Sequence, residues 1–462
     1  MKKSVLESFL KKIYRNDQIS ESIVTGRAVE TLFKVLIQAT ISREVPALSN
    51  PIAKKADCLL DIPCRLKQVA FAYLLSLMLP GRKHSLTQAS QVGSLHKSQF
   101  SRFLRRHGDL AVESLQRTAA RTCRAIQRPP VVAGGPWTIA ILIDATLQSR
   151  SSRHSGNSHK FSHGKGYVIG HQWTNILLLI NGKKIPLPPL AWISGRERKR
   201  RGLKKETEQE AVIRYLSDLD LSQYVGTYEN HEVVVLADSG YDNKKLQASI
   251  LSRGWDFVFS MKSSRGSRLS SQKNAGAQGN CSVADLFRKA KIFPWKTIRA
   301  YANGWKRRKR KEFRARELTG FISGITDEVR LVLSEERGSR RGRKYLVCSN
   351  IRVRMGAIVR VYRKRWEIEL FHKDVKSLMG FEDVSCHDFQ SVESHVHWVY
   401  CAWLLLPEIS GKSGSVLEAM TVLQQEVELS PFKHLIQLST RIHGFRDVQR
   451  YCREVINANK AA

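Results

Sequence analysis

The chain has 462 residues, which is too long for one ordinary domain and suggests two to four. Hydrophobic residues make up 42% of it, enough for folded cores, and this excludes a largely disordered protein. Lys and Arg number 77 against 41 Asp and Glu, a net charge of +36, which favours nucleic acid as the partner. A generally basic protein without such a partner is the alternative that charge alone leaves open.

The eight cysteines are scattered and form no C-x-x-C pair, and no secretory signal pattern begins the sequence. We therefore expect a reducing, cytoplasmic setting. The longest apolar runs, residues 71–80 and 398–407, are too short to cross a bilayer, so we expect no membrane partner.

Residues 1–130 predict a helical N-terminal domain that binds DNA. Two short helical segments, 86–92 and 96–106, flank a glycine turn, and the second carries Lys97 and Arg102. This pattern is typical of a helix-turn-helix, whose second helix contacts DNA. A helical hairpin that only packs against its neighbours gives the same pattern, so both interpretations stay open.

After a linker rich in Pro and Gly, residues 131–260 predict the first part of an α/β core. Apolar runs indicate buried strands, and Asn181-Gly182 indicates a two-residue hairpin turn. Three strands, a helix, a strand, a helix and a strand follow one another, which is the order of a ribonuclease-H-like core with a mixed sheet. The strands are expected at 138–143, at 167–170 with 174–180, and at 183–187, 232–237 and 256–260, and the helices at 206–219 and 244–253.

Residues 261–344 interrupt this order. They contain 23 Lys and Arg against 7 Asp and Glu, a net charge of +16 in 84 residues, with short apolar alternations. We predict a basic, β-rich insertion. The core resumes over 345–410, with a strand at 345–349 and one long helix at 356–379. Residues 411–462 are expected to form a helical C-terminal region.

Two aspartates directly follow predicted buried strands: Asp144 follows 138–143, and Asp238 follows 232–237. A carboxylate in that position is held on a rigid frame and still reaches solvent, and functional groups of α/β sheets gather at strand ends. Either aspartate alone would also suit a turn or a cap. Two of them on strands expected to be neighbours favour a shared site.

A third carboxylate, Glu369, lies on the predicted long helix. Tyr362, Arg365, Glu369 and Lys376 are spaced so that their side chains share one helix face. An apolar stripe runs beside this row, which therefore lies at the margin of the core. A merely solvated helix face is the alternative, but it does not explain a Tyr, an Arg, a Glu and a Lys aligned along that margin.

The spacing Tyr362-x2-Arg365-x3-Glu369-x6-Lys376 resembles the Y-R-E-K signature of bacterial insertion-sequence transposases of the DDE class. The sequences around Asp144 and Asp238, and an insertion placed before the glutamate, are similar to that family as well. The resemblance covers roughly residues 130–405. It implies a ribonuclease-H-like catalytic core and action on DNA.

The resemblance also implies the chemistry of the site. Asp144, Asp238 and Glu369 would be the catalytic triad and would bind two Mg²⁺ ions, for which Mn²⁺ can substitute. One ion would activate the attacking water or 3′-hydroxyl, and the other would stabilise the leaving oxygen. The expected reactions are DNA cleavage and strand transfer.

Further residues are expected to contact DNA. By the same resemblance, Tyr362, Arg365 and Lys376 would bind phosphates near the cleaved end. Trp295 and Trp305 lie in the basic insertion, where an aromatic ring can stack on an unpaired base. Packing inside the small β domain is the alternative for each tryptophan.

Two other segments have more than one interpretation. The basic run 196–205 suits either a loop that contacts phosphates or an ordinary solvated loop. Cys386, His387, His395 and His397 suggest zinc, but their spacing fits none of the common zinc patterns, and packed histidines are the favoured interpretation.

These observations predict a cut-and-paste transposase that binds the terminal inverted repeats of its own element. The resemblance implies a homo-oligomer assembled around two DNA ends and target DNA, associated with the nucleoid of a bacterial cell. Two alternatives stay open: a ribonuclease-H-like nuclease without strand transfer, and a non-catalytic DNA-binding relic of a transposase.

Overall fold

A computed structural model describes residues 59–427, apart from residues 82, 94, 151–154, 165, 272–280, 290–293, 302–309, 338–342 and 384–385. The chain divides into two compact units. The larger unit comprises Lys83–Leu86 and Lys97–Leu404. The smaller unit comprises the residues before and between these segments and those from Leu405 onward. Most of the predicted C-terminal region and residues 1–58 lie outside the described residues.

The larger unit is built on a sheet of 13 strands, within which five strands form the ribonuclease-H-like core in the order β4-β3-β1-β6-β7. β3 pairs antiparallel with β1 and β4, whereas β6 is parallel to both β1 and β7. The mixed α/β fold predicted from the sequence is confirmed. The core strands are β1 (Ile139–Ser149), β3 (Gly166–Ile180), β4 (Lys183–Pro186), β6 (Val233–Ala237) and β7 (Asp256–Met261).

Local sequence explains these strands. All five residues of β6 are buried, as expected for a β-branched, apolar strand covered on both faces. The turn between β3 and β4 has positive φ at Asn181 and Gly182, 48° and 73°, the conformation that this residue pair favours. Within β3, Gly170 allows close approach to β1, because a Cβ there would lie 1.9 Å from the carbonyl oxygen of Gln148.

Two strands were not predicted. β2 (His159–His163) pairs with the start of β3 and forms an edge of the sheet. β3 is also one continuous strand instead of the two predicted pieces. The polar stretch from Gly170 to Gln172 hid this continuity. The short β5 (Leu190–Ala191) pairs with β3 as well.

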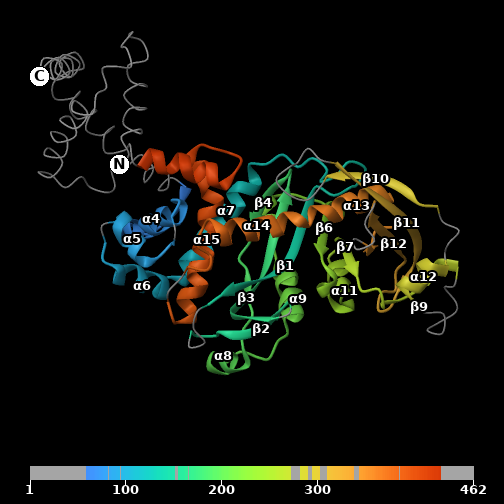
Figure 1. The fold of residues 1–462 in the computed structure, drawn as a ribbon, viewed down its shortest axis with the longest axis horizontal. Coiled ribbons are helices and arrows are strands. Elements are labelled where there is room, and N and C mark those ends of the chain that lie inside the picture. The colour runs from blue at the N-terminus through green and yellow to red at the C-terminus, as the bar shows by residue number, and fades with distance from the viewer. Residues whose placement is uncertain are drawn as a thin grey trace, which may run out of the picture. The chain divides into compact units, whose positions relative to one another are not determined.

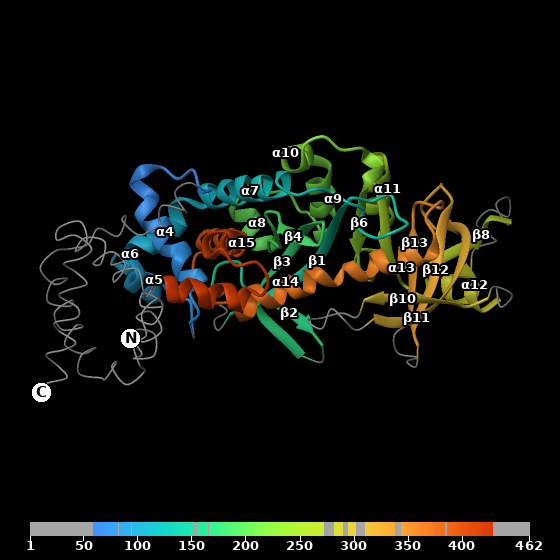
Figure 2. The same cartoon turned by 90° about the horizontal axis from the view of Figure 1, so that it is seen from above.

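Helices cover both faces of the core. α9 (Glu208–Asp218) and α11 (Lys244–Ser252) lie on one face, and α13 (Met355–Lys364) and α14 (Trp366–Ser377) lie on the other (Figures 1 and 2). α9 begins with a capping box between Thr207 and Glu210.

The long helix predicted at 356–379 is instead two helices that meet at Arg365. There the N–H of Arg365 donates to the carbonyl of Tyr362 at 3.0 Å, and the N–H of Ile368 donates to the carbonyl of Arg365 at 3.2 Å. Both bonds span three residues instead of four, so the helix tightens locally at this point.

The basic insertion continues the core sheet. β13 (Lys344–Cys348) pairs with β7 on one side and with β12 of the insertion on the other, so the ladder is unbroken. The prediction of a β-rich insertion is confirmed, with one short helix added. Its elements are β8 (Gly266–Leu269), β9 (Cys281–Ser282), α12 (Val283–Lys289), β10 (Lys296–Tyr301), β11 (Arg310–Ile322) and β12 (Val329–Glu336).

The remaining elements are helical. In the larger unit they are α6 (Lys97–Arg106), α7 (Gly108–Arg124), α8 (Gly195–Arg200), α10 (Ser222–Val225), η3 (Asn230–Glu232), η4 (Ser239–Tyr241) and most of α15 (Phe389–Ser410). The smaller unit contains α4 (Cys64–Met78), most of α5 (Leu86–Gly93) and a helix over 416–427. Within the part of the chain that the structure describes, no helix is long and apolar enough to cross a membrane.

Candidate active site

Asp144 and Asp238 lie beside each other on neighbouring strands. The parallel register of β1 and β6 ends at the pair Ile143 and Ala237, and the two aspartates are the next residues of each chain segment. Parallel neighbours are about 4.8 Å apart, so the two carboxylates start from adjacent backbone positions. Asp238 caps η4, and its carboxylate accepts a hydrogen bond from the N–H of Gly240 at 2.8 Å.

Asp144 differs from its predicted position, because it lies inside β1 and not after it. Its partner across the ladder is Asn175 of β3, and this pairing continues to Ser149. β3 thus keeps β1 extended after β6 has ended. The carboxylates therefore lie at a step in the sheet, where β6 stops and the pair of β1 and β3 continues.

Arg365 connects Asp144 with Glu369. Its guanidinium donates to Glu369 Oε1 at 2.5 Å and lies 3.6 Å from Asp144 Oδ2. The helix joint supplies Arg365, and the first turn of α14 supplies Glu369 one turn later. The Arg365 and Asp144 side chains are only 12% and 18% exposed, so their attraction is weakly screened.

The environment of Asp144 penalises its negative charge. Burial raises the pKa of this carboxyl from its ordinary 3.8 to about 7, although the Arg365 charge acts in the opposite direction. Repulsion by Asp238 and Glu369 also raises this pKa. Three carboxylates close enough to repel one another, with a single guanidinium between two of them, leave an excess of negative charge that a bound cation would relieve.

The donor set suits Mg²⁺, because carboxylate oxygens are the ligands that this ion prefers in proteins. Among the described residues, however, no group of three or more His, Cys, Asp or Glu is close enough to enclose a metal ion as it stands. The Arg365 guanidinium lies between Asp144 and Glu369 and provides positive charge there. The chemistry of these carboxylates thus fits divalent cations, although the described residues do not enclose a metal ion in this arrangement.

A buried chain of polar groups lies behind Asp144. The Tyr400 hydroxyl donates to Asn175 Oδ1 at 2.5 Å, and the Asn175 amide faces His372 Nε2 at 2.8 Å. Since the Asn175 amide nitrogen is a donor, Nε2 of His372 accepts, and the ring proton belongs on Nδ1. That nitrogen lies 4.0 Å from Asp144 Oδ2. Burial lowers the pKa of His372 to about 3, so the ring is neutral.

This chain was not predicted from the sequence. The signal for His372 was its position three residues after Glu369, which places it on the same side of the helix. No sequence pattern identified Asn175 or Tyr400, because each acts through a contact made only in the folded chain.

Glu208 is an acidic residue of the site region that was not predicted either. It accepts hydrogen bonds from Tyr241 at 2.8 Å, Thr174 at 2.8 Å and Gln172 at 2.7 Å. Tyr241 lies three residues after Asp238, so these bonds fix the loop after β6 to β3. Burial and the neighbouring Glu208 raise the pKa of Tyr241, which keeps its hydroxyl protonated as a donor.

The other members of the predicted helix row have different surroundings. Tyr362 is buried, and burial raises the pKa of its hydroxyl, while the nearby Arg365 charge opposes that rise. Lys376 lies 3.8 Å from Glu382, and burial lowers the pKa of its ammonium group. Glu367 is directed away from this row, 3.7 Å from Lys184 of β4, and is half-buried.

The predicted DNA contacts outside the core are described in part. Lys97 and Arg102 are exposed on α6. Trp295 is half-buried, and the guanidinium of Arg316 lies 4.3 Å from the centre of its ring. Trp305 lies outside the described residues.

Two of the three histidines considered for zinc, His395 and His397, are packed in α15, whereas His387 precedes that helix and is exposed. His395 faces the carbonyl of Gly380 at 3.0 Å, and His397 faces the carbonyl of Glu393 at 2.6 Å. Burial lowers the pKa of both rings to about 4. These contacts agree with the packed interpretation.

Residues 138–405 match the family model described as transposase DDE domain. The match spans both aspartates, the basic insertion and the two helices that carry Arg365 and Glu369. It confirms the resemblance to transposases of the DDE class. No curated protein matches the chain.

Proposed function

This chain belongs to the family of transposase DDE domains, and from that membership we propose that it cuts and joins DNA at the ends of its own element. The proposed substrates are the terminal inverted repeats, and the reactions are phosphodiester hydrolysis followed by transesterification to a target. One observation carries the proposal. Asp144 and Asp238 occupy adjacent positions on parallel strands, and Arg365 connects Asp144 with Glu369.

We assign the catalytic role to Asp144, Asp238 and Glu369. The family generally uses divalent metal ions, and these carboxylates would hold two Mg²⁺ ions, or Mn²⁺ in their place. Bound there, the ions would supply an activated water or 3′-hydroxyl and would stabilise the leaving oxygen. The raised pKa of Asp144 supports this role, since perturbed carboxyls are typical of functional sites.

Arg365 has two roles in this account. Without cations it neutralises Asp144 and Glu369, and with cations bound it turns toward a DNA phosphate, where its guanidinium makes paired hydrogen bonds. Tyr362 would position the same phosphate from α13. Lys376 would contact the backbone about two turns beyond Glu369, leaving Glu382 when DNA binds.

DNA recognition is proposed for two further regions. Lys97 and Arg102 present positive charge on one short helix, as a recognition helix does. In the insertion, Trp295 and Trp305 are proposed to stack on an unpaired base at the DNA end. For Trp295, the flanking Arg314 and Arg316 support this role, because they surround the ring with positive charge.

Cutting at two element ends and joining to one target requires two active sites, so we propose a homo-oligomer around the paired ends. A nuclease without strand transfer would use the same triad and is the alternative activity. The net charge of +16 in the insertion favours the transposase, because hydrolysis alone needs fewer DNA contacts.

The test uses the purified full-length protein and a DNA fragment that carries the inverted repeats found beside its coding region. With Mg²⁺ we expect cleavage at the repeat boundaries and joining of the released ends to a plasmid. Cleavage without joining would support the nuclease. Binding without either reaction would indicate a non-catalytic relic.

A further inference from the structure

A protruding basic region extends beyond the active site. It comprises residues 159–164 and 166–170, which form β2 and the start of β3, and residues 195–205, which form α8 and the loop after it. We call it the basic arm. Between Asp144 and Glu197 the sequence has no acidic residue over 52 positions, so no negative charge of that segment offsets its cations.

The hairpin of the arm extends beyond the step in the sheet at which Asp144 and Asp238 lie. Past Asp144, the ladder of β1 and β3 continues for five residues to Ser149, a rise of about 16 Å beyond the end of β6. There β3 also pairs with β2, at the edge of the sheet. Figure 1 shows this hairpin reaching past the neighbouring strands. A duplex about 20 Å wide, placed at the catalytic step, would lie against it.

The two parts of the arm are fixed to each other. The ring of Trp192 contacts His159 and Phe161, with ring centres 5.0 and 5.2 Å apart. Asn157 accepts from the N–H of Ser194 at 2.8 Å and donates to the carbonyl of Trp192 at 2.8 Å. The hairpin and α8 therefore form one surface.

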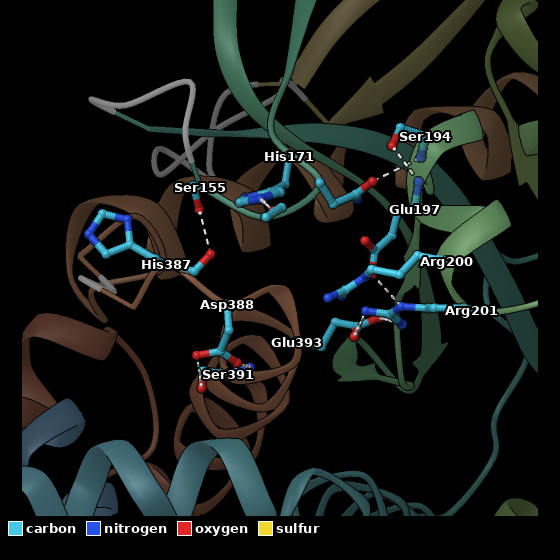
Figure 3. A network of polar contacts seen from close by, with 12 residues as sticks. Ser155, His171, Ser194, Glu197, Arg200, Arg201, His387, Asp388, Ser391 and Glu393 are labelled. Atoms are coloured by element: carbon cyan, nitrogen blue, oxygen red, sulfur yellow. Dashed lines mark hydrogen bonds and ion pairs between the residues drawn. The ribbon is translucent and has the colours of Figure 1, made fainter.

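α8 is also anchored to the body of the larger unit. Its Glu197 is buried and accepts from Arg201 at 2.6 Å, and Arg201 in turn makes two bonds to Glu393 of α15, at 2.9 and 3.3 Å (Figure 3). Arg198 bonds to the carbonyls of Ile193 and Lys204. Some basic residues of this segment are thus structural.

The other basic residues of the arm are directed to solvent. Among the residues that the structure describes, none of these exposed cations forms an ion pair, and one of them lies 3.8 Å over the ring of the exposed Tyr167. They are Lys160, Arg196, Lys199, Lys204 and Lys205. A rigid base that holds several unpaired cations is suited to a polyanion.

We propose that the basic arm binds the second DNA duplex of the reaction, the target. This inference rests on the proposed function. In the sheet order the arm lies on one side of β1 and β6, and the basic insertion lies on the other. If the insertion holds the element end, the arm is left for the duplex to which that end is joined. The lysines of the arm are suited to phosphate contacts, which carry no sequence information. Such contacts are what binding to a target without a fixed sequence requires.

The test compares two reactions of the full-length protein: cleavage of element-end DNA, and joining of a pre-cleaved end duplex to a supercoiled plasmid. The variant replaces three exposed cations, Lys160→Ser, Lys199→Ser and Lys204→Ser. Each phosphate contact contributes a slope of about 0.9 to log affinity against log salt. At 0.1 M salt, compared with 1 M, one contact therefore strengthens binding by a factor of about 10^0.9, so its loss should weaken binding about eightfold. At limiting plasmid, joining should fall at least about tenfold and recover as plasmid is raised. Cleavage should stay within about twofold of the wild type.

A matched control removes three exposed cations elsewhere, Lys183→Ser, Arg117→Ser and Lys245→Ser. Lys183 lies in β4, paired with Ile180 at the end of β3 away from the arm, so the control removes the same charge from other places. Normal joining by the arm variant would overturn the proposal, as would equal losses of cleavage and joining, or an equal loss in the control.

A binding measurement tests the arm without catalysis. With the element-end duplex saturating, an unrelated 40-bp duplex is titrated at several salt concentrations. The arm variant should lower the steepness of log affinity against log salt by about 2.7, three contacts at 0.9 each, and the control should not. An unchanged slope in the arm variant would refute the role of the arm, whether or not the wild type is active. Inactivity of the wild type would refute the proposed function and is a separate outcome.

Discussion

Replacing Asp144 by Asn should stabilise the metal-free protein at pH 8. The Asp144 carboxyl has a pKa raised by burial to about 7, against 3.8 ordinarily. Between these two pKa values the folded chain keeps a proton that the unfolded chain has released. The loss of stability caused by the buried negative charge is therefore absent below about pH 4 and complete above about pH 7. Three pKa units correspond to about 4 kcal/mol. This figure already includes the attraction of Arg365, and because relaxation of the site reduces such a cost we expect a net gain of about 1–3 kcal/mol.

Thermal unfolding measures this effect. For a cooperative unit of roughly 300 residues, 1 kcal/mol shifts the midpoint by about 1.5 °C, so the variant should unfold about 2–5 °C higher at pH 8 and equal the wild type at pH 4. Asp218→Asn, at an exposed position of α9, is the control and should change stability by less than about 0.5 kcal/mol.

Mg²⁺ should remove or reverse this difference in stability at pH 8. A cation at 100 times its dissociation constant stabilises the wild type by about 2.7 kcal/mol, and the variant should gain little because a ligand is missing. A variant less stable than the wild type without metal, or one stabilised equally by Mg²⁺, would refute the reasoning that these carboxylates repel one another.

Three other results are expected. DNA affinity should fall with salt at a slope steeper than about −3, and a shallower slope would contradict binding dominated by phosphate contacts. Trp295→Ala should impair end cleavage or joining with an unchanged midpoint of unfolding, whereas a lowered midpoint with normal transposition would favour packing. Asn175→Leu should lower stability by about 1–3 kcal/mol in denaturant unfolding, because Tyr400 and His372 lose their buried partner; an unchanged free energy of unfolding would show that this chain contributes nothing.

The elements best predicted from the sequence are those specified locally. The buried strand at 233–237 and the Asn181-Gly182 turn depend on residue types within a few positions, and both were predicted correctly. β2 was missed because its sequence, His-Lys-Phe-Ser-His, has no apolar alternation; it is a strand only because β3 provides a partner.

The site shows the same division. Sequence spacing indicated which carboxylates to consider, and the strand register then gave Asp144 and Asp238 adjacent positions. The contact of Arg365 with Asp144 could not be predicted, since it depends on how α14 packs over β1 and on the tightened joint at Arg365. Asn175 likewise gained a partner only through this packing.

The triad assignment is tested most directly by comparing Glu369→Gln with Glu367→Gln in Mg²⁺-dependent cleavage of element-end DNA. Both changes remove one negative charge from the first turn of α14 and keep the side-chain volume. Glu369 contacts Arg365 beside Asp144, whereas Glu367 contacts Lys184 of β4. We expect Glu369→Gln to lose cleavage and joining while it still binds DNA, and Glu367→Gln to remain largely active. An active Glu369→Gln enzyme would contradict the assignment.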